Sequence, residues 1–151
     1  MKIYTVVFSF VCFCFGLLVQ AQPKAIAFSE LEVAMRTNPK PVVIFLHTLW
    51  CSYCALMEKK TFANTEVINK LNNKYYFVSF DAEYKEDITF FNRVFSFKKT
   101  GIKGGVHSLA STLSGQQAYP TLIFLNSKLE KVYEHNAYIR PKELTKLLEA
   151  L

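Results

Sequence analysis

An apolar strand pattern that runs directly into a Cys-x-x-Cys pair constrains this chain more than any other feature. Residues 42–46 are all apolar, a short bend follows, and residues 55–60 are good helix formers. This order of strand, loop and helix places Cys51 at the N-terminus of a helix and Cys54 one turn further along. Unpaired N–H groups and the helix dipole at that position favour a thiolate. We therefore expect Cys51 to attack a disulfide and Cys54 to resolve the mixed disulfide that forms.

The length and charge of the chain limit the remaining possibilities. The chain has 151 residues, 51% of them hydrophobic, which is enough for one well-packed domain. Lysine and arginine outnumber aspartate and glutamate by 18 to 12, but the lysines are dispersed and form no basic block longer than a pair. No nucleic-acid-binding motif is visible, so we do not expect nucleic acid as a partner.

The N-terminus has the organisation of a secretory signal peptide. Lys2 precedes an apolar stretch at residues 6–19, and a small residue, Ala21, stands before Gln22. We predict a signal peptide at residues 1–21 and a mature domain at residues 22–151 that is exported to the periplasm or the extracellular space. The alternative is an uncleaved membrane anchor, because residues 3–19 approach the minimum length of a spanning helix.

Cleavage would leave only one pair of cysteines. Cys12 and Cys14 lie inside the predicted signal peptide, whereas Cys51 and Cys54 would enter a compartment in which disulfides persist. A purely structural disulfide is the less favoured interpretation, since so small a loop constrains the unfolded chain little. A zinc site is less favoured still, and we expect no metal or cofactor, because the three histidines have no ligand-type spacing: His47, His107 and His135.

The rest of the chain alternates helix and strand patterns. After a lead-in at residues 23–28 that resembles an edge strand, Ser29 and Glu32 form a capping-box pattern, and residues 38–41 end the helix. Further helices are predicted at residues 64–71, at 107–113 and from Pro141 onward, with strands at residues 75–81, 121–125 and 131–135. A parallel pair of strands followed by an antiparallel pair predicts an α/β fold with a mixed sheet.

One segment does not fit this alternation. Residues 88–91 and 94–97 are short aromatic-rich runs joined by Asn92 and Arg93, which predicts a β-hairpin around 88–97. A basic, glycine-containing loop is predicted to follow at residues 98–105. The insertion at residues 84–105 is either padding on one edge of the domain or a lip beside the active site that contacts a partner.

Two separated motifs resemble the thioredoxin-fold superfamily, and the resemblance covers residues 25–151. The first is the sequence from Trp50 to Cys54, and the second is Tyr119-Pro120-Thr121, which resembles the cis-proline loop of that family. The resemblance implies a thioredoxin-like fold, a central mixed β-sheet flanked by helices, with thiol–disulfide oxidoreductase activity. It also implies that Trp50 packs beside the disulfide and that Tyr119 offers its backbone to an extended substrate.

Within that superfamily, residues 54–62 are similar to the C-terminal domain of the DsbD-type thiol reductant transporters and to small secreted thioredoxin-like proteins. In those proteins a glutamate in the position of Glu58 lies near the cysteine pair. The chain departs from the thioredoxin pattern six residues before Cys51, where Phe45 replaces a buried aspartate. Because deprotonation of Cys54 is usually assigned to that aspartate, another group must do it. Glu58 is one candidate and His47 the other, although each can equally be a structural residue.

These features together predict a function. We expect an exported, monomeric oxidoreductase that reduces disulfides of other exported proteins and is itself reduced by a membrane electron donor. Ser52 and Tyr53, between the cysteines, do not decide the direction of electron flow. An oxidase or isomerase is therefore an alternative, and a thioredoxin-fold binding module without redox turnover is another.

Overall fold

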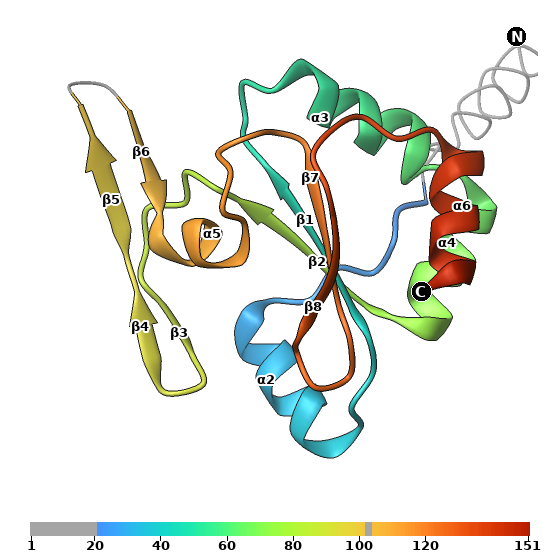
Figure 1. The fold of residues 1–151 in the computed structure, drawn as a ribbon, viewed down its shortest axis with the longest axis horizontal. Coiled ribbons are helices and arrows are strands. Elements are labelled where there is room, and N and C mark those ends of the chain that lie inside the picture. The colour runs from blue at the N-terminus through green and yellow to red at the C-terminus, as the bar shows by residue number, and fades with distance from the viewer. Residues whose placement is uncertain (1–20, 102–103) are drawn as a thin grey trace, which may run out of the picture.

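The computed structural model describes residues 21–101 and 104–151 (Figure 1). The predicted signal peptide at residues 1–21 lies outside these ranges except for its last residue. Within the described ranges, no helix combines the length and the apolar composition that crossing a membrane requires.

A four-stranded mixed sheet forms the centre of the domain. Its strand order is β2 (Tyr76–Asp81), β1 (Val42–His47), β7 (Thr121–Leu125) and β8 (Lys131–His135). β1 runs parallel to β2 and antiparallel to β7, and β8 runs antiparallel to β7. The predicted α/β fold with a mixed sheet is therefore confirmed.

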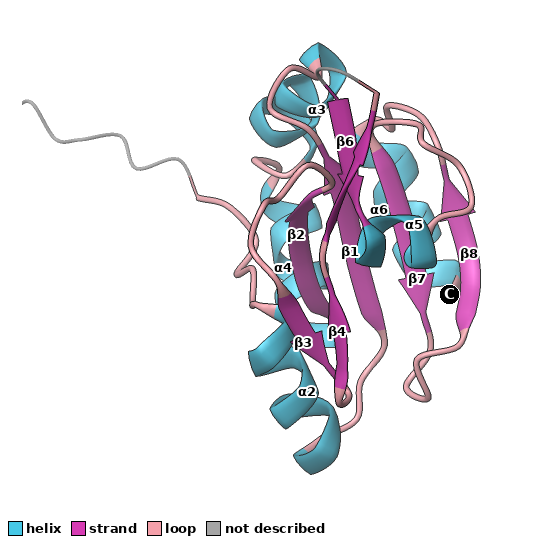
Figure 2. Ribbon diagram, turned by 90° about the vertical axis from the view of Figure 1, so that its left-hand side faces the viewer, coloured by secondary structure: helices cyan, strands magenta, loops and turns pink. Residues whose placement is uncertain are grey.

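Helices cover both faces of this sheet, as Figures 1 and 2 show. On one face α2 (Phe28–Thr37) and α5 (Ser108–Leu113) pack against the even-numbered residues of β1, and on the other face α3 (Ser52–Leu56), α4 (Thr65–Lys74) and α6 (Pro141–Ala150) pack against the odd-numbered ones. Val42 to Leu46 are each at most 1% exposed. β1 is thus buried on both faces, which explains its unbroken apolar sequence.

The first helix begins earlier than the sequence predicts. The predicted capping box of Ser29 and Glu32 is wrong, because Ala27 is the N-cap and its N–H donates to the carboxylate of Glu30 at 2.9 Å. Phe28 is the first helical residue and packs edge-on against Phe80. Burial of this ring therefore determines where the helix begins. The predicted edge strand at 23–28 is reduced to one bridge with Phe77.

The insertion consists of two hairpins rather than one. The predicted hairpin is confirmed as β3 (Ile88–Phe90) paired with β4 (Arg93–Phe95), but its turn lies one residue earlier, at Phe91 and Asn92, which both have positive φ. The predicted loop at residues 98–105 is wrong. Most of it belongs to a second hairpin, β5 (Phe97–Thr100) paired with β6 (Gly104–His107).

The first hairpin is fixed to α2 at its turn. The Glu32 carboxylate accepts the backbone N–H of Phe91 at 2.8 Å and pairs with Arg36, whose guanidinium lies 5.7 Å from the centre of the Phe91 ring. Glu32 therefore joins the insertion to the main domain.

The second hairpin is fixed through the fully buried His107. Its backbone N–H donates to the carbonyl of Ala82 at 2.7 Å, and its Nδ1 accepts the N–H of Leu109 as the N-cap of α5. Because Nδ1 is an acceptor, Nε2 carries the proton and lies 3.1 Å from the carbonyl oxygen of Glu86. Burial lowers the pKa of His107, although the contact with Glu86 opposes this effect.

A glycine in β6 makes the second hairpin possible. A Cβ atom on Gly105 would lie 2.2 Å from Cζ of Phe97 and 2.6 Å from the carbonyl oxygen of Lys98. We predict that Gly105→Ala destabilises β5 and β6 by about 1–3 kcal/mol, because the backbone oxygen of Lys98 has to move. Hydrogen exchange of the β5 and β6 amides measures this loss. Gly104→Ala is the matched control, since its Cβ would meet nothing closer than 3.4 Å; equal protection in both variants would contradict the argument.

The stability of the domain should decrease in mild acid. The folded state lowers the pKa of His107 below its ordinary value near 6.5, so the unfolded chain binds more protons as the pH falls below about 6.5. The part of the folding stability that depends on a neutral His107 is fully present above that pH and is lost as the pH falls below it. We expect the free energy of unfolding, measured in urea, to decrease between pH 7 and pH 5, and to decrease less in His107→Asn than in the unaltered protein. This variant keeps an N-capping acceptor. An identical decrease in both proteins would exclude His107 as the cause.

Candidate active site around Cys51 and Cys54

The buried strand β1 ends at the two cysteines. Cys51 is the N-cap of α3, and its sulfur is bonded to that of Cys54 at 2.11 Å. The Sγ atom of Cys51 also accepts the backbone N–H of Cys54 at 3.1 Å. Cys51 is 8% exposed and Cys54 is 2% exposed, so Cys51 is the more accessible residue. The predicted position of Cys51 at the start of a helix is confirmed.

Trp50 forms the rim of the site. Its side chain is 68% exposed, its indole N–H donates to the Glu83 carboxylate at 3.1 Å, and its ring lies edge-on to that of Tyr119 at 6.1 Å. Sequence reasoning did not single out Glu83 as a site residue. The available signal was its position just after β2, at the same end of the sheet as Cys51.

The loop before β7 lies beside the cysteines. The peptide bond between Tyr119 and Pro120 is cis, as the resemblance implies. The next residue, Thr121, pairs with Leu46 of β1, so the cis peptide and the cysteines lie at the same end of the sheet. The sequence motifs predicted to form the site are therefore brought together, although Tyr119 comes 65 positions after Cys54 in the sequence.

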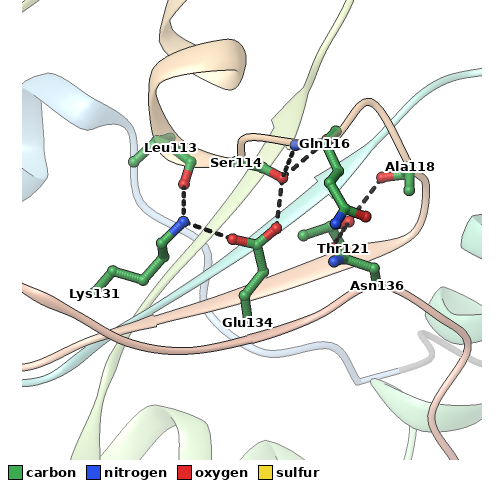
Figure 3. A network of polar contacts seen from close by, with 8 residues as sticks. All are labelled: Leu113, Ser114, Gln116, Ala118, Thr121, Lys131, Glu134 and Asn136. Atoms are coloured by element: carbon green, nitrogen blue, oxygen red, sulfur yellow. Dashed lines mark hydrogen bonds and ion pairs between the residues drawn. The ribbon is translucent and has the colours of Figure 1, made fainter.

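Polar contacts on both sides of Tyr119 and Pro120 hold this loop to β8 (Figure 3). The Ser114 hydroxyl donates to Glu134 at 2.6 Å, and Lys131 donates to the other carboxylate oxygen at 2.6 Å. The Thr121 hydroxyl lies 2.8 Å from the side-chain oxygen of Asn136. Burial alone would raise the pKa of Glu134, but hydrogen bonds from Lys131 and Ser114 outweigh it and leave this pKa lowered.

A thioredoxin-like domain family matches residues 28–151 of the sequence. The chain belongs to the thioredoxin-like family. Solved structures agree with this assignment. The thioredoxin from Thermus thermophilus has a TM-score of 0.64 and 16% identity, over 86% of this chain and 87% of that chain. The oxidised C-terminal domain of Neisseria meningitidis DsbD has a TM-score of 0.56 and 16% identity, over 85% of this chain and 98% of that chain.

A thiol:disulfide interchange protein, DsbD from Campylobacter jejuni, is 33% identical over 46 residues. The match covers 30% of this chain and 8% of the relative, so the chain spans less than a tenth of the length of the curated relatives it matches. The thioredoxin-like chain thus has a disulfide-oxidoreductase fold with a Cys-x-x-Cys pair.

This thioredoxin-like site has no carboxylate at position 45. Phe45 is 1% exposed and belongs to the same apolar cluster as both cysteines. The neighbouring His47 is half-buried, and its ring stacks on that of Phe45 with centroids 5.1 Å apart. Glu58 is exposed and lines a pocket of about 380 Å³ together with Phe45. The two candidates for proton transfer therefore both lie beside Phe45.

Electrostatic interactions connect these two candidates. Burial lowers the pKa of His47, while the negative charges of Glu58 and Asp81 raise it and partly offset burial. Among residues 21–101 and 104–151, neither candidate is hydrogen-bonded to a cysteine, and no three His, Cys, Asp or Glu side chains come together as a metal site would require.

The helix after the cysteines changes its hydrogen-bonding pattern. α3 continues into a π-helix, η2 (Met57–Thr61), in which the N–H of Phe62 bonds to the carbonyl of Met57. The wider turn buries Met57 and Thr61, and the Thr61 hydroxyl donates to the carbonyl of Ile139 at 2.7 Å. Apolar periodicity does not distinguish a π-turn from an α-helical turn, so sequence patterns do not predict this one.

The charge of Glu58 should be measurable at His47. We predict that Glu58→Gln lowers the pKa of His47 further, because the variant removes one of the two negative charges that raise it. A pH titration of the His47 ring protons by NMR measures this shift. Glu66→Gln, on the exposed side of α4, is the matched control and should leave the titration unchanged. An unchanged or raised pKa in Glu58→Gln would show that the two side chains do not interact.

Proposed function

We propose that this thioredoxin-like chain is an exported thiol–disulfide oxidoreductase that reduces disulfides in other exported proteins. The observation that carries the proposal is the Cys51–Cys54 pair, which caps a helix at the same end of the sheet as the cis Tyr119–Pro120 peptide. Cys51 is the more accessible residue, as an attacking thiol requires, and Cys54 is the more buried one, as suits a resolving thiol.

The reaction takes place in two exchanges. The thiolate of Cys51 attacks one sulfur of the substrate disulfide, a mixed disulfide forms, and the other substrate sulfur leaves as a thiolate. The thiolate of Cys54 then attacks Sγ of Cys51, the Cys51–Cys54 disulfide forms, and the second substrate thiolate leaves. Two electrons pass to the substrate, and its thiolates take up two protons. The N–H of Cys54, which bonds to Sγ of Cys51, stabilises the attacking thiolate.

Cys54 must lose a proton before it attacks. Phe45 cannot accept one, and the surrounding apolar cluster opposes the thiolate by desolvation. We assign this proton to Glu58, which is exposed to solvent and shares a pocket with Phe45. His47 is the second candidate, because burial keeps its ring neutral and able to accept a proton.

The rim of the site would bind the substrate. Leu49, Trp50 and Tyr53 are 88%, 68% and 62% exposed, and they surround the cysteines with apolar surface. Tyr119 would offer its backbone to an extended substrate segment beside the disulfide. The hydrogen bond of Trp50 to Glu83 holds the indole in place, so less side-chain entropy is lost when a substrate binds.

The signal-peptide pattern of residues 1–21 supports export, and we propose residues 22–151 as a mature, monomeric domain. An oxidising compartment would convert the dithiol to the disulfide, so continued reduction of substrates needs a donor. We propose a membrane protein that carries a reduced dithiol, because the same exchange chemistry can regenerate Cys51 and Cys54.

The equilibrium reduction potential tests the direction of electron flow. A value near that of thioredoxin, about −270 mV, would support a reductant, whereas a value near about −120 mV would make the chain an oxidase. Absence of a reversible couple would leave a binding module without redox turnover.

The roles of the two cysteines can be separated by substitution. We predict that Cys54→Ser accumulates a mixed disulfide with a model disulfide peptide, because the attacking thiol is present and the resolving thiol is missing. Cys51→Ser should accumulate at least about tenfold less, since the remaining thiol is 2% exposed. Mass spectrometry of the protein after acid quenching measures the adduct. Equal adduct formation by both variants would contradict the assignment.

A further inference from the structure

The second hairpin reaches the catalytic end of the molecule. We call its described residues, 97–101 and 104–107, the basic arm. In both ribbon views the free end of β5 and β6 lies level with α3, at the end of the sheet that carries the cysteines (Figures 1 and 2). The arm stands to one side of the site and does not cover it.

Two exposed lysines lie on the arm, and a third lies against it. Lys98 and Lys99 are exposed on β5, and Nζ of the exposed Lys85 lies 3.4 Å from the centre of the Phe97 ring. The ion pairs among the described residues all lie elsewhere, so none of these three lysines is in contact with a carboxylate there. Their charge is available to a partner.

The arm is held in a fixed position. The carbonyl of Ser96 accepts the N–H of Ser108, and the Ser108 hydroxyl accepts the N–H of Ser96. His107 bonds to Ala82 at the base of the arm, and Phe97 lies directly over Gly105. Because these contacts already order the arm, a partner that binds it does not have to supply that ordering entropy.

One connecting segment, after β2, contacts both the rim of the site and the arm. Glu83 accepts the indole N–H of Trp50, and two residues later Lys85 lies on the Phe97 ring of the arm. A substrate whose disulfide reaches Cys51 would therefore pass Trp50 and meet Lys85 and the arm next.

We propose that the basic arm binds an acidic, extended segment of the substrate protein, next to the disulfide that is reduced. This inference rests on the proposed function, because it assigns a substrate class to the same site. Charge complementarity with Lys85, Lys98 and Lys99 selects the acidic segment. An anionic membrane would be attracted by the same lysines, and the test below distinguishes it from a substrate segment.

Reaction rates with matched peptides test the proposal. The probes are three disulfide peptides that differ only in four flanking residues, which are acidic, neutral or basic. The reduced full chain should react fastest with the acidic peptide. Lys98→Glu combined with Lys99→Glu should lower that rate constant by about tenfold, and high salt should remove the difference, since the Debye length shrinks to about 3 Å at 1 M.

Two controls isolate the arm. Lys128→Glu combined with Lys146→Glu makes the same change in net charge, and Lys128 lies in the turn between β7 and β8, at the opposite end of the sheet. This control variant should keep the preference for the acidic peptide. Hydroxyethyl disulfide, a small neutral substrate, should react equally with all three proteins, because it is too short to reach the arm.

Binding without redox chemistry separates the two proposals. The anisotropy of a labelled acidic peptide that lacks cysteine should report binding to the oxidised chain, and this binding should be lost in the Lys98 and Lys99 variant. If hydroxyethyl disulfide and every peptide stay oxidised while this binding persists, the proposed function fails and the arm assignment holds.

The opposite result would overturn the arm assignment. If all three peptides react at one rate and the acidic peptide binds the variant as well as the unaltered chain, the arm does not select substrates. Lysine-dependent sedimentation with vesicles of anionic lipid, without preference for the acidic peptide, would also overturn it and would assign the arm to a membrane surface.

Discussion

The double burial of β1 is the constraint on which the rest of the structure depends. Five consecutive apolar residues are covered by helices on one face and by helices on the other, with β2 and β7 on either side. Each buried methylene contributes about 0.8 kcal/mol, so the strand has little freedom to shift in register. Its C-terminal end is therefore a fixed point, and Cys51 follows it by four residues. The reactive pair is therefore positioned by the core that holds β1 and α3.

The same burial explains the unusual chemistry expected near Cys54. A carboxylate at position 45 would face the apolar cluster and would need a partner there. Phe45 instead fills this space and packs edge-on against Phe62. Phenylalanine at this position packs well, but it cannot accept a proton. The group that accepts the proton of Cys54 therefore has to lie nearer the surface, where solvent reduces the cost of its charge. Glu58 and His47 both lie beside the aromatic ring that takes the place of a carboxylate.

Local patterns predicted most of the fold and the two cysteines. The apolar run at residues 42–46, the helix formers after Cys51 and the Tyr119-Pro120-Thr121 motif each act over a few residues, and all three expectations are confirmed. The start of α2 was mispredicted because contact of Phe28 with Phe80, 52 residues away, outweighed the polar pattern of Ser29 and Glu32. β5 and β6 escaped prediction because lysine and glycine predominate where strands usually alternate apolar and polar residues. Glu83 was missed as a site residue because only the folded chain brings it to Trp50.

The bond between His107 and Ala82 has an architectural consequence. The chain leaves the main domain after β2 and returns at α5 through two residues that are hydrogen-bonded to each other at 2.7 Å. The segment between them is an excursion whose two ends already meet, and Glu32 and Phe28 of α2 also contact its first hairpin. Excursions of this kind can be shortened, lengthened or exchanged without moving the elements from which they start. The scaffold around the cysteines can therefore stay constant while evolution, or an engineer, replaces the excursion and changes which proteins the cysteines encounter.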